Sequence, residues 1–358
     1  MFVAWRDIGF AKGRFALMGA VVVLITLLVG LLSGLTAGLA RENTSAITEL
    51  PADRLAFAEP TGGQSLSFAN STVAERSWRI WAERPGVRWA TPIGIRTLGG
   101  AAGDRSTGVS AFGVEPGSGV APEGVGAGRA VLAAKAADEL DVRPGEKLRV
   151  GPVELTVAAV AGEASYSHTP VVWMALDDWQ RIGHDGTGVD EQATVIALRT
   201  DGADLAAGDA AAGTTTRSLD DALGAIGSYR AENGSLQLMR GFLFVISALV
   251  IGAFFTVWTI QRGPEIAVLK ALGAGTPYLL RDALGQAVVM LAAGCGLGTA
   301  LAVGAGAFIE GGDVPFVLDA PTVLLPAGVL IVLGLLGAAL SVRRITAVDP
   351  LTALGSAR

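Results

Sequence analysis

The sequence has few charged residues for its length. Asp, Glu, Lys and Arg make up 17% of the 358 residues, whereas a soluble globular protein usually has about 25%. The formal net charge is −6, so the chain also lacks the basic excess that nucleic-acid binding requires. These shortages exclude a nucleic-acid partner and indicate that much of the chain lies in a membrane.

Residues that bind metals or act as nucleophiles are also scarce. The single cysteine, Cys295, lies in an apolar run, so no intramolecular disulfide forms and the reactive thiolate is suppressed. His168 and His184 are too few for a histidine-based metal centre. The glycine-rich stretch 124–128 lacks the Gly-x4-Gly-Lys-Ser/Thr pattern of a phosphate-binding loop, and no other stretch has it. We expect no metal site and no such nucleotide site in this chain.

Four long runs without any charged residue stand out instead. They cover residues 15–40, 241–261, 283–309 and 320–342. The hydrocarbon core of a bilayer is about 30 Å thick and needs roughly 20 apolar residues of helix. Each run meets that length, and no other stretch is comparably free of charge. The sequence therefore predicts four transmembrane helices.

The basic residues outside the runs predict the direction of insertion. Segments 1–14, 262–282 and 343–358 together hold nine Lys and Arg against four Asp and Glu. The short loop 310–319 has three acids and no base, and region 41–240 has 18 basic and 26 acidic residues. Short cytoplasmic loops are enriched in Lys and Arg. We expect a multi-pass plasma-membrane protein with both termini cytoplasmic and region 41–240 outside the cytoplasm.

Region 41–240 is long enough to form a core of its own. Strand-like patterns lie at 86–98, 147–150, 153–160, 170–176 and 194–198, with the second and third forming a hairpin. Helical spacing covers 128–140, and the Gly-rich stretch 98–128 predicts a long loop. Another helix starts at Ser218 and is interrupted near Asn233-Gly234, so it either connects the domain to the second span as a stalk or closes the domain. These patterns predict an α+β domain.

The connection between the second and third spans contains a short amphipathic helix. Pro264 suits its first turn, and Gly273 suits a left-handed cap at its end. Ile266, Leu269 and Leu272 form an apolar edge, while Glu265 and Lys270 remain polar. Such a helix either lies on the lipid surface or docks into a groove of a partner protein.

The same segment carries a family resemblance. Arg262, Glu265, Ile266, Ala267, Leu269, Lys270, Ala271, Leu272, Gly273 and Ala274 resemble the pattern that follows the second span in FtsX/MacB-like permeases of ABC transporters. The start of the third run, 278–286, and the tail, 343–354, are similar to the family as well. The resemblance covers 1–45 and 236–358 well, and the insertion only loosely.

This resemblance implies a permease subunit that has no enzymatic activity and no cofactor of its own. Residues 264–273 would be the coupling helix, seated on a separate ABC ATPase that binds and hydrolyses ATP, in an assembly of two permeases and two ATPases. The residues implied in ATPase coupling are Arg262, Glu265, Ile266, Leu269, Lys270, Leu272 and Gly273. The transmitted motion would drive efflux of a hydrophobic or amphipathic substrate. The alternative is a non-transporting mechanotransmitter that activates an extracytoplasmic partner such as a cell-wall hydrolase.

Glycines recur at four-residue spacing in two of the runs. Gly30, Gly34 and Gly38 lie along one side of the first predicted helix, and Gly294 and Gly298 repeat the spacing in the third. Small residues at this spacing let helix backbones approach closely. Packing within the chain and contact between two copies of the permease both fit the pattern. The runs also hold no ionisable residue of the kind that ion-coupled transporters keep at membrane depth, which favours an external energy source.

The only indications of the substrate are scattered aromatic residues and residues that could bind a metal ion in it. Gram-positive haem exporters within the family have a comparable short form, which the stretches 43–46 and 166–173 resemble. Haem needs an iron ligand beside an apolar wall. The candidates for such a substrate site are Glu49, Tyr166, His168, Tyr229, Phe242 and Phe254. Each is equally well explained by packing or by placement against lipid.

Overall fold

The computed structural model describes residues 12–183, 192–263, 268, 270, 272–309 and 314–346. The chain divides into two compact units. We call residues Leu39–Gly234 the inserted domain, and residues Met1–Gly38 with Ser235–Arg358 the helix bundle.

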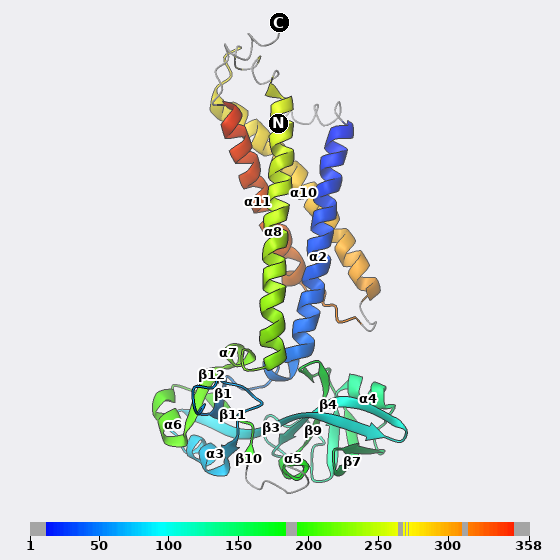
Figure 1. Ribbon diagram of the computed structural model, residues 1–358, viewed down its shortest axis with the longest axis vertical. Coiled ribbons are helices and arrows are strands. Elements are labelled where there is room, and N and C mark those ends of the chain that lie inside the picture. The colour runs from blue at the N-terminus through cyan, green and yellow to red at the C-terminus, as the bar shows by residue number, and fades with distance from the viewer. Residues whose placement is uncertain are drawn as a thin grey trace. The chain divides into compact units, whose positions relative to one another are not determined.

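The helix bundle is built from long apolar helices (Figure 1). They are α2 (Lys12–Thr48), α8 (Gly227–Gln261), α10 (Thr276–Ile309) and α11 (Ala320–Thr346). Each is long and apolar enough to cross a membrane. Phe255, Leu291 and Leu330 form the centre of the bundle, whereas Leu249 and Leu324 on its surface are 70% and 63% exposed. A surface of that kind suits lipid rather than water, so the four predicted transmembrane helices are confirmed.

One helix boundary differs from the sequence-based prediction. Helix α8 runs without a break through Asn233 and Gly234, so the predicted interruption there is wrong. The break lies instead between α7 (Leu219–Leu223) and α8. A glycine in a helix interior costs only about 1 kcal/mol, which a helix as long as α8 can absorb. The predicted cap of α7 is confirmed, because Ser218 Oγ accepts a hydrogen bond from the Asp221 amide at 3.1 Å.

The inserted domain is an α+β fold, as predicted. Its strands are β1 (Arg54–Ala58), β2 (Val73–Ala74), β3 (Val87–Ala102), β4 (Arg105–Val114), β5 (Arg129–Leu132), β6 (Lys147–Val150), β7 (Val153–Val160), β8 (Ser165–Tyr166), β9 (Thr169–Ala175), β10 (Gln192–Ala193), β11 (Val195–Thr200) and β12 (Thr214–Ser218). Its short helices, besides α7, are α3 (Glu75–Ala82), α4 (Ala134–Leu140), α5 (Leu176–Ile182) and α6 (Leu205–Ala212).

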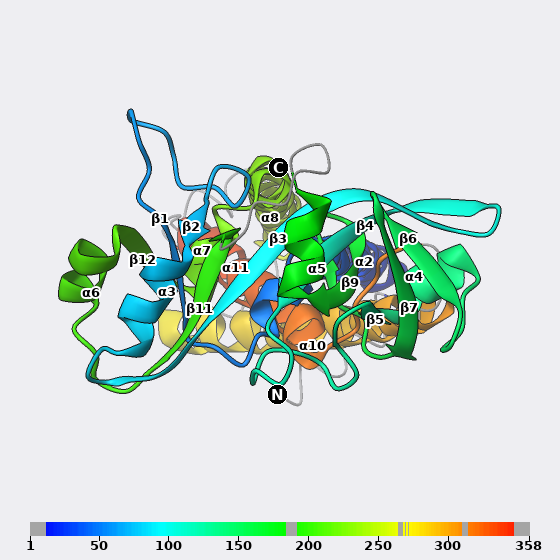
Figure 2. The ribbon, with the colours of Figure 1, turned by 90° about the horizontal axis from the view of Figure 1, so that it is seen from below.

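Strand β3 is central to the domain, because it connects the strands β12, β1 and β11 to the strands β4, β9, β5, β7 and β6 in the main sheet. The strand order is β12-β1-β11-β3-β4-β9-β5-β7-β6, and the end of β3 also pairs with β6. This last pairing closes the strands from β3 to β6 into a ring. Two pairs, β4 with β9 and β5 with β7, are parallel. Figure 2 shows α5 lying across β3 and β4.

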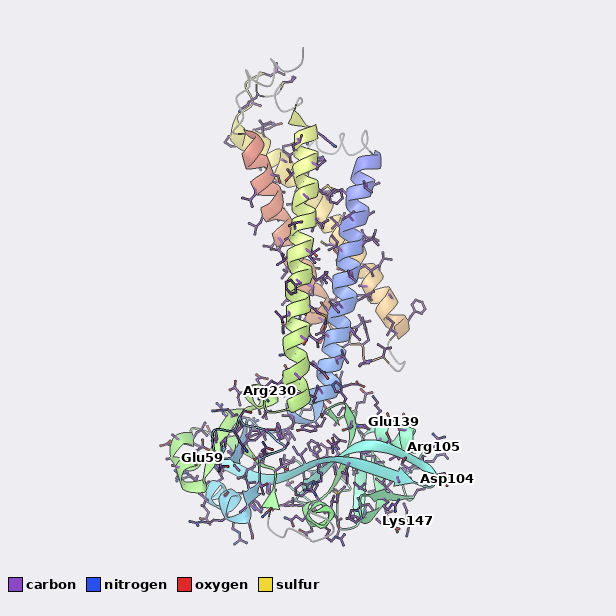
Figure 3. All side chains as sticks on the ribbon, in the orientation of Figure 1. Glu59, Asp104, Arg105, Glu139, Lys147 and Arg230 are labelled. Atoms are coloured by element: carbon purple, nitrogen blue, oxygen red, sulfur yellow. The ribbon has the colours of Figure 1, made fainter. Side chains whose placement is uncertain are left out.

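Two sequence-based predictions for this domain are wrong. The predicted loop is wrong for residues 98–114, since β3 continues to Ala102 and β4 follows after a two-residue turn, whereas 115–128 lies outside strands and helices, as predicted. Two glycines of the predicted loop, Gly99 and Gly108, face each other across the strands, and Gly113 faces Gly94 of the predicted strand 86–98. Asp104 and Arg105 lie at the tip of this hairpin (Figure 3), and nearby Thr107 donates a hydrogen bond to Glu139 of α4 at 2.6 Å.

The other wrong prediction is a single helix over 128–140. Only 134–140 is helical, and 129–132 forms β5 between β7 and β9. The residues Ala130, Val131 and Leu132 are fully buried, and a short apolar run of this kind has no periodicity that distinguishes a buried strand from a helix. By contrast, the predicted hairpin of 147–150 with 153–160 is confirmed as β6 and β7.

The main sheet separates two hydrophobic cores. Ala111, Ala130 and Leu132 belong to one core, while their strand neighbours Phe112 and Val131 belong to the other, as the two-residue alternation of a strand requires. Trp81 of α3 is fully buried in the first core, and its Nε1 donates to Thr214 Oγ1 at 3.0 Å.

Packing of Trp81 on α6 gives a test of this core. A Cβ at Gly208 would overlap the Trp81 ring, so Gly208→Val should destabilise the inserted domain by about 2 kcal/mol or more. The measurement is the thermal unfolding midpoint of the full chain in lipid nanodiscs. The matched control is Gly99→Val, where a Cβ meets nothing within 4 Å. Equal midpoints for the two variants would contradict the described packing.

Candidate functional site: the coupling segment and the helix junction

The predicted coupling segment is described in part. Glu265, Ile266 and Leu269 lie outside the described residues. The amide of Leu272 donates to the Val268 carbonyl at 3.0 Å, and that of Gly273 donates to Lys270 at 3.0 Å. Gly273 has a φ of +95°, the left-handed geometry that ends helices at glycine.

The end of this segment presents apolar side chains on its surface. Leu272 is 79% exposed and Val268 is 56% exposed. Residues four apart lie on the same face of a helical turn. Exposed aliphatic side chains between two helix ends suit contact with a partner or with lipid.

Arg262 connects the two helices that flank the segment. Its guanidinium lies 5.1 Å from the centre of the Trp258 ring and donates to Gln286 Oε1 of α10 at 2.6 Å. Gln286, which is 3% exposed, in turn donates to Asp282 at 3.0 Å. A planar guanidinium can stack and donate at the same time, so Arg262 fixes the end of α8 against the start of α10.

The predicted small-residue positions lie at close contacts within the chain. A Cβ at Gly30 would overlap Ala302 of α10, and Cβ atoms at Gly294 and Gly298 would overlap Val22 and Thr26 of α2. Cβ atoms at Gly34 and Gly38 would overlap residues 315–316. These glycines therefore let α2 approach α10 and the segment before α11.

The candidate substrate residues fall into two groups that belong to different units. Phe242 and Phe254 lie on α8 in the helix bundle, with Phe242 65% exposed. The other four lie in the inserted domain. Glu49 is exposed and 3.8 Å from Arg41, Tyr229 packs against the core that contains Phe112, and Tyr166 is buried between Phe68 and Phe112, each with its ring centre 5.7 Å away. Burial raises the pKa of the Tyr166 phenol, which keeps it neutral.

His168 occupies a strained turn. Strands β8 and β9 are joined by Ser167 and His168 alone, whose φ values are +51° and +64°. A two-residue hairpin with both central residues at positive φ normally contains Asn-Gly or a similar pair. Side chains other than glycine are uncommon there, and such strain is often associated with function.

The turn is held by the last turns of α2 and the first turns of α8. The amides of Ser167 and His168 donate to the carbonyls of Asn43 and Glu42 at 3.0 and 3.2 Å. Ser228 Oγ donates to Asn43 Oδ1 at 2.7 Å and lies 2.9 Å from Ser167 Oγ. Asn43 is only 1% exposed. We call Glu42, Asn43, Lys135, Ser167, His168, Ser228 and Glu232 the junction cluster.

His168 lies at the centre of the junction cluster. Its Nε2 lies 2.9 Å from Glu232 Oε2 and 3.0 Å from Asn43 Nδ2. Neutral imidazole Nε2 serves only one of them, as a donor to Glu232 or as an acceptor from Asn43. Glu42 Oε2 lies 3.9 Å from His168 Nδ1, and Glu42 also pairs with Lys135 at 2.6 Å.

The sequence indicated the stretch 43–46 and His168 separately. It did not predict that they meet in the junction cluster. Its members lie on α2, α4, the β8–β9 turn and α8, and Asn43 is 185 residues from Ser228. No local pattern links positions so far apart. The cluster fixes the two helix ends to one turn of the domain, which is a structural coupling rather than a catalytic arrangement.

Comparison with known families agrees with this architecture. Residues 15–214 match the family described as MacB-like periplasmic core domain. Residues 238–350 match the family described as FtsX-like permease C-terminal. The chain belongs to the FtsX/MacB-like permease family. The fold class predicted from the sequence, four transmembrane helices with an α+β domain inserted between the first and second, is confirmed for this permease.

Relatives span the whole permease. The chain is 28% identical to a putative hemin transport system permease protein HrtB of Staphylococcus haemolyticus, over 99% of both chains. It is 24% identical to an uncharacterized ABC transporter permease of Mycobacterium bovis, again over 99% of both. Among solved structures, the extracellular domain of the noncanonic transporter YknZ covers 47% of this chain and 98% of its own, with 13% identity and a TM-score of 0.35. The relatives make this protein an ABC transporter permease of the MacB/HrtB type.

The junction cluster gives a test through Asn43. Asn43→Ala removes the acceptor of Ser228 and should destabilise the inserted domain by about 1–3 kcal/mol. We expect a lower unfolding midpoint together with faster hydrogen exchange in peptides covering 227–234. Asn70→Ala is the control, because Asn70 is exposed. Unchanged exchange at 227–234 in Asn43→Ala would show that the cluster does not hold α8.

Proposed function

We propose that this permease couples ATP hydrolysis by a separate ABC ATPase subunit to efflux of a hydrophobic or amphipathic substrate, with haem as the first candidate. Both termini and residues 262–282 lie in the cytoplasm, and the inserted domain lies on the outer side of the plasma membrane. The basic residues around 262–282 and the acidic excess of 41–240 support this direction.

The observation that supports ATPase docking best is the exposed aliphatic surface at the end of the coupling segment. Leu272, at 79% exposure, lies on the loop between two membrane helices and beside the glycine that ends the helical turn. A partner groove would bury this side chain, and interface energy concentrates in such buried anchors. Arg262 supports the same role, because its bond to Gln286 transmits displacement of the segment to both α8 and α10.

The working unit that we propose is a permease homodimer with two ATPases in a lipid bilayer. Gly30, Gly294 and Gly298 lie against residues of the same chain. A second permease would therefore use another face of the bundle.

The haem proposal rests on relatives. Full-length relatives are named as putative hemin transport permeases. Phe242 offers an exposed aromatic wall on α8. Of the oxygen and nitrogen donors in the inserted domain, Glu49 is exposed, whereas Tyr166 is buried and His168 is engaged by Glu232. Glu49 is thus the most accessible of these candidate ligands for iron.

The junction cluster favours a second candidate, a mechanotransmitter that moves no substrate. Because Asn43 and Ser228 hold the ends of α2 and α8 to one turn, movement of either helix reaches the inserted domain directly. Both candidates need the ATPase, and only the exporter needs a cargo.

Docking is tested with Leu272→Asp. A carboxylate in an apolar groove is strongly disfavoured, so we expect loss of copurification with the coexpressed ABC ATPase while membrane insertion persists. Val160→Asp is the matched control, since Val160 is 37% exposed on the inserted domain. Full copurification of Leu272→Asp would refute docking through this surface.

Substrate coupling is tested by adding hemin to the assembled complex in nanodiscs. We expect ATP hydrolysis to rise saturably with hemin, and ATP-dependent loss of hemin from loaded proteoliposomes. Stimulation without any loss of hemin from the liposomes would favour the mechanotransmitter. A complex that hydrolyses ATP at the same rate at all hemin concentrations would contradict haem as the substrate.

A further inference from the structure

A cavity of roughly 490 Å³ lies within the inserted domain. Its wall is formed by the middle of β3, by α5, by residues 67–72 and by the turn between α7 and α8. Volumes of about 300–1,000 Å³ are typical of small-molecule sites. Aromatic side chains of Phe68, Tyr166 and Trp179 line it together with one cation, Arg96.

Trp179 provides an unsatisfied donor in this wall. The residue is 9% exposed, and its Nε1 is buried without a hydrogen-bond partner among the described residues. A buried donor left without an acceptor is costly and is rare in native proteins. The indole N–H can only donate, so a group that relieves it must bring an acceptor.

The position of this indole is set by a glycine pair. Gly94 of β3 and Gly113 of β4 face each other across the strands, and a Cβ on either would overlap Trp179. The preceding residue, Asp178, anchors α5, because its carboxylate accepts from the Gly128 amide at 2.7 Å. Glycine at both positions is therefore needed for the Trp179 ring to lie where it does, beside the cavity.

Arg96 adds a second donor group beside the same ring. Its guanidinium carbon lies 5.6 Å from the centre of the Trp179 ring, and it makes no ion pair with any carboxylate in the described part of the chain. A guanidinium only donates and matches the geometry of a carboxylate. Arg96 therefore favours an anion in the part of the cavity beside the Trp179 ring.

Three other polar groups of the wall are already paired. Thr194 Oγ1 bonds to the backbone of Ile95, Ser71 Oγ donates to the Thr194 carbonyl at 2.6 Å, and Gln180 Nε2 donates to the Gln192 carbonyl at 3.0 Å. Arg96, by contrast, is a cation without an ion-pair partner among the described residues, and it lies beside aromatic surface.

We propose that this cavity is a binding site for a small amphipathic anion, one with a flat apolar body and a carboxylate held by Arg96 beside the Trp179 ring. The apolar body packs against Phe68 and Tyr166. The site lies next to the junction cluster, because Ser167 and Ser228 belong to both. A bound anion thus contacts the turn that holds α2 and α8. This proposal does not depend on haem export or on the ATPase.

The test uses naphthalene-2-carboxylate as the probe and the full chain in lipid nanodiscs, labelled with 5-fluorotryptophan. The chain has seven tryptophans, and Trp179→Phe identifies the fluorine signal of Trp179. We expect this signal to shift saturably with the probe. Because a hydrogen bond to a charged group is worth more than a neutral one, Arg96→Met should weaken binding about tenfold to a hundredfold.

Three controls separate the site from general partitioning into the membrane. Arg76→Met removes an exposed arginine of the same domain and should leave the affinity unchanged. Arg96→Lys should recover part of it. Neutral naphthalene-2-carboxamide should bind wild-type protein at least about tenfold more weakly, which requires no variant to fold. Absence of a saturable shift would overturn the proposal, and so would equal affinity for the carboxylate and the carboxamide.

Discussion

The absence of charge from four long apolar runs is the constraint on which the whole structure depends. A bilayer offers no water to the backbone, so each run must satisfy its own amide and carbonyl groups and becomes a helix. The exposed leucines along α8 and α11 follow from the same constraint, because lipid rather than protein covers them. The basic residues between the apolar runs are the basis of the direction of threading that we propose.

Polar contacts within the inserted domain hold the ends of two of these helices. Helix α2 ends and α8 begins within the domain, and Asn43, Ser228 and Glu232 meet the β8–β9 turn there. Positive φ at both Ser167 and His168 brings their backbone amides to the carbonyls of α2. The hydrogen bonds of these amides to α2 offset the conformational cost of positive φ in the turn. In the function that we propose, this connection would carry helix movement to the domain, whether the result is release of a substrate or activation of a partner.

The sequence predicted those features that local chemistry determines. Hydrophobic length gave the four helices, glycine at 273 gave the left-handed end of the coupling segment, and Ser218 gave the cap of α7. It failed where tertiary pairing overrides local signals. Gly99, Gly108 and Gly113 were assigned to a loop, although they pair across β3 and β4, and Gly113 together with Gly94 lets Trp179 of α5 approach the sheet. Asn233-Gly234 was read as a break, although α8 continues through it.

The candidate sites show the same division. The coupling segment could be proposed from the sequence because its residues are adjacent along the chain. The junction cluster and the cavity beside Arg96 and Trp179 were not, since they combine segments more than 80 residues apart along the chain, as Arg96 and Trp179 are. No periodicity records which strand will lie beside which helix, and only the folded sheet brings Trp179 onto Gly94 and Gly113.

The direction of threading is the claim most open to measurement. Leu272→Cys and Asp104→Cys, placed separately in a Cys295→Ala background, put single thiols at two exposed positions. With an impermeant maleimide on intact cells, position 104 should react and position 272 should react only after the membrane is opened. Labelling of 272 but not of 104 in intact cells would reverse the topology and contradict the cytoplasmic docking of an ATPase.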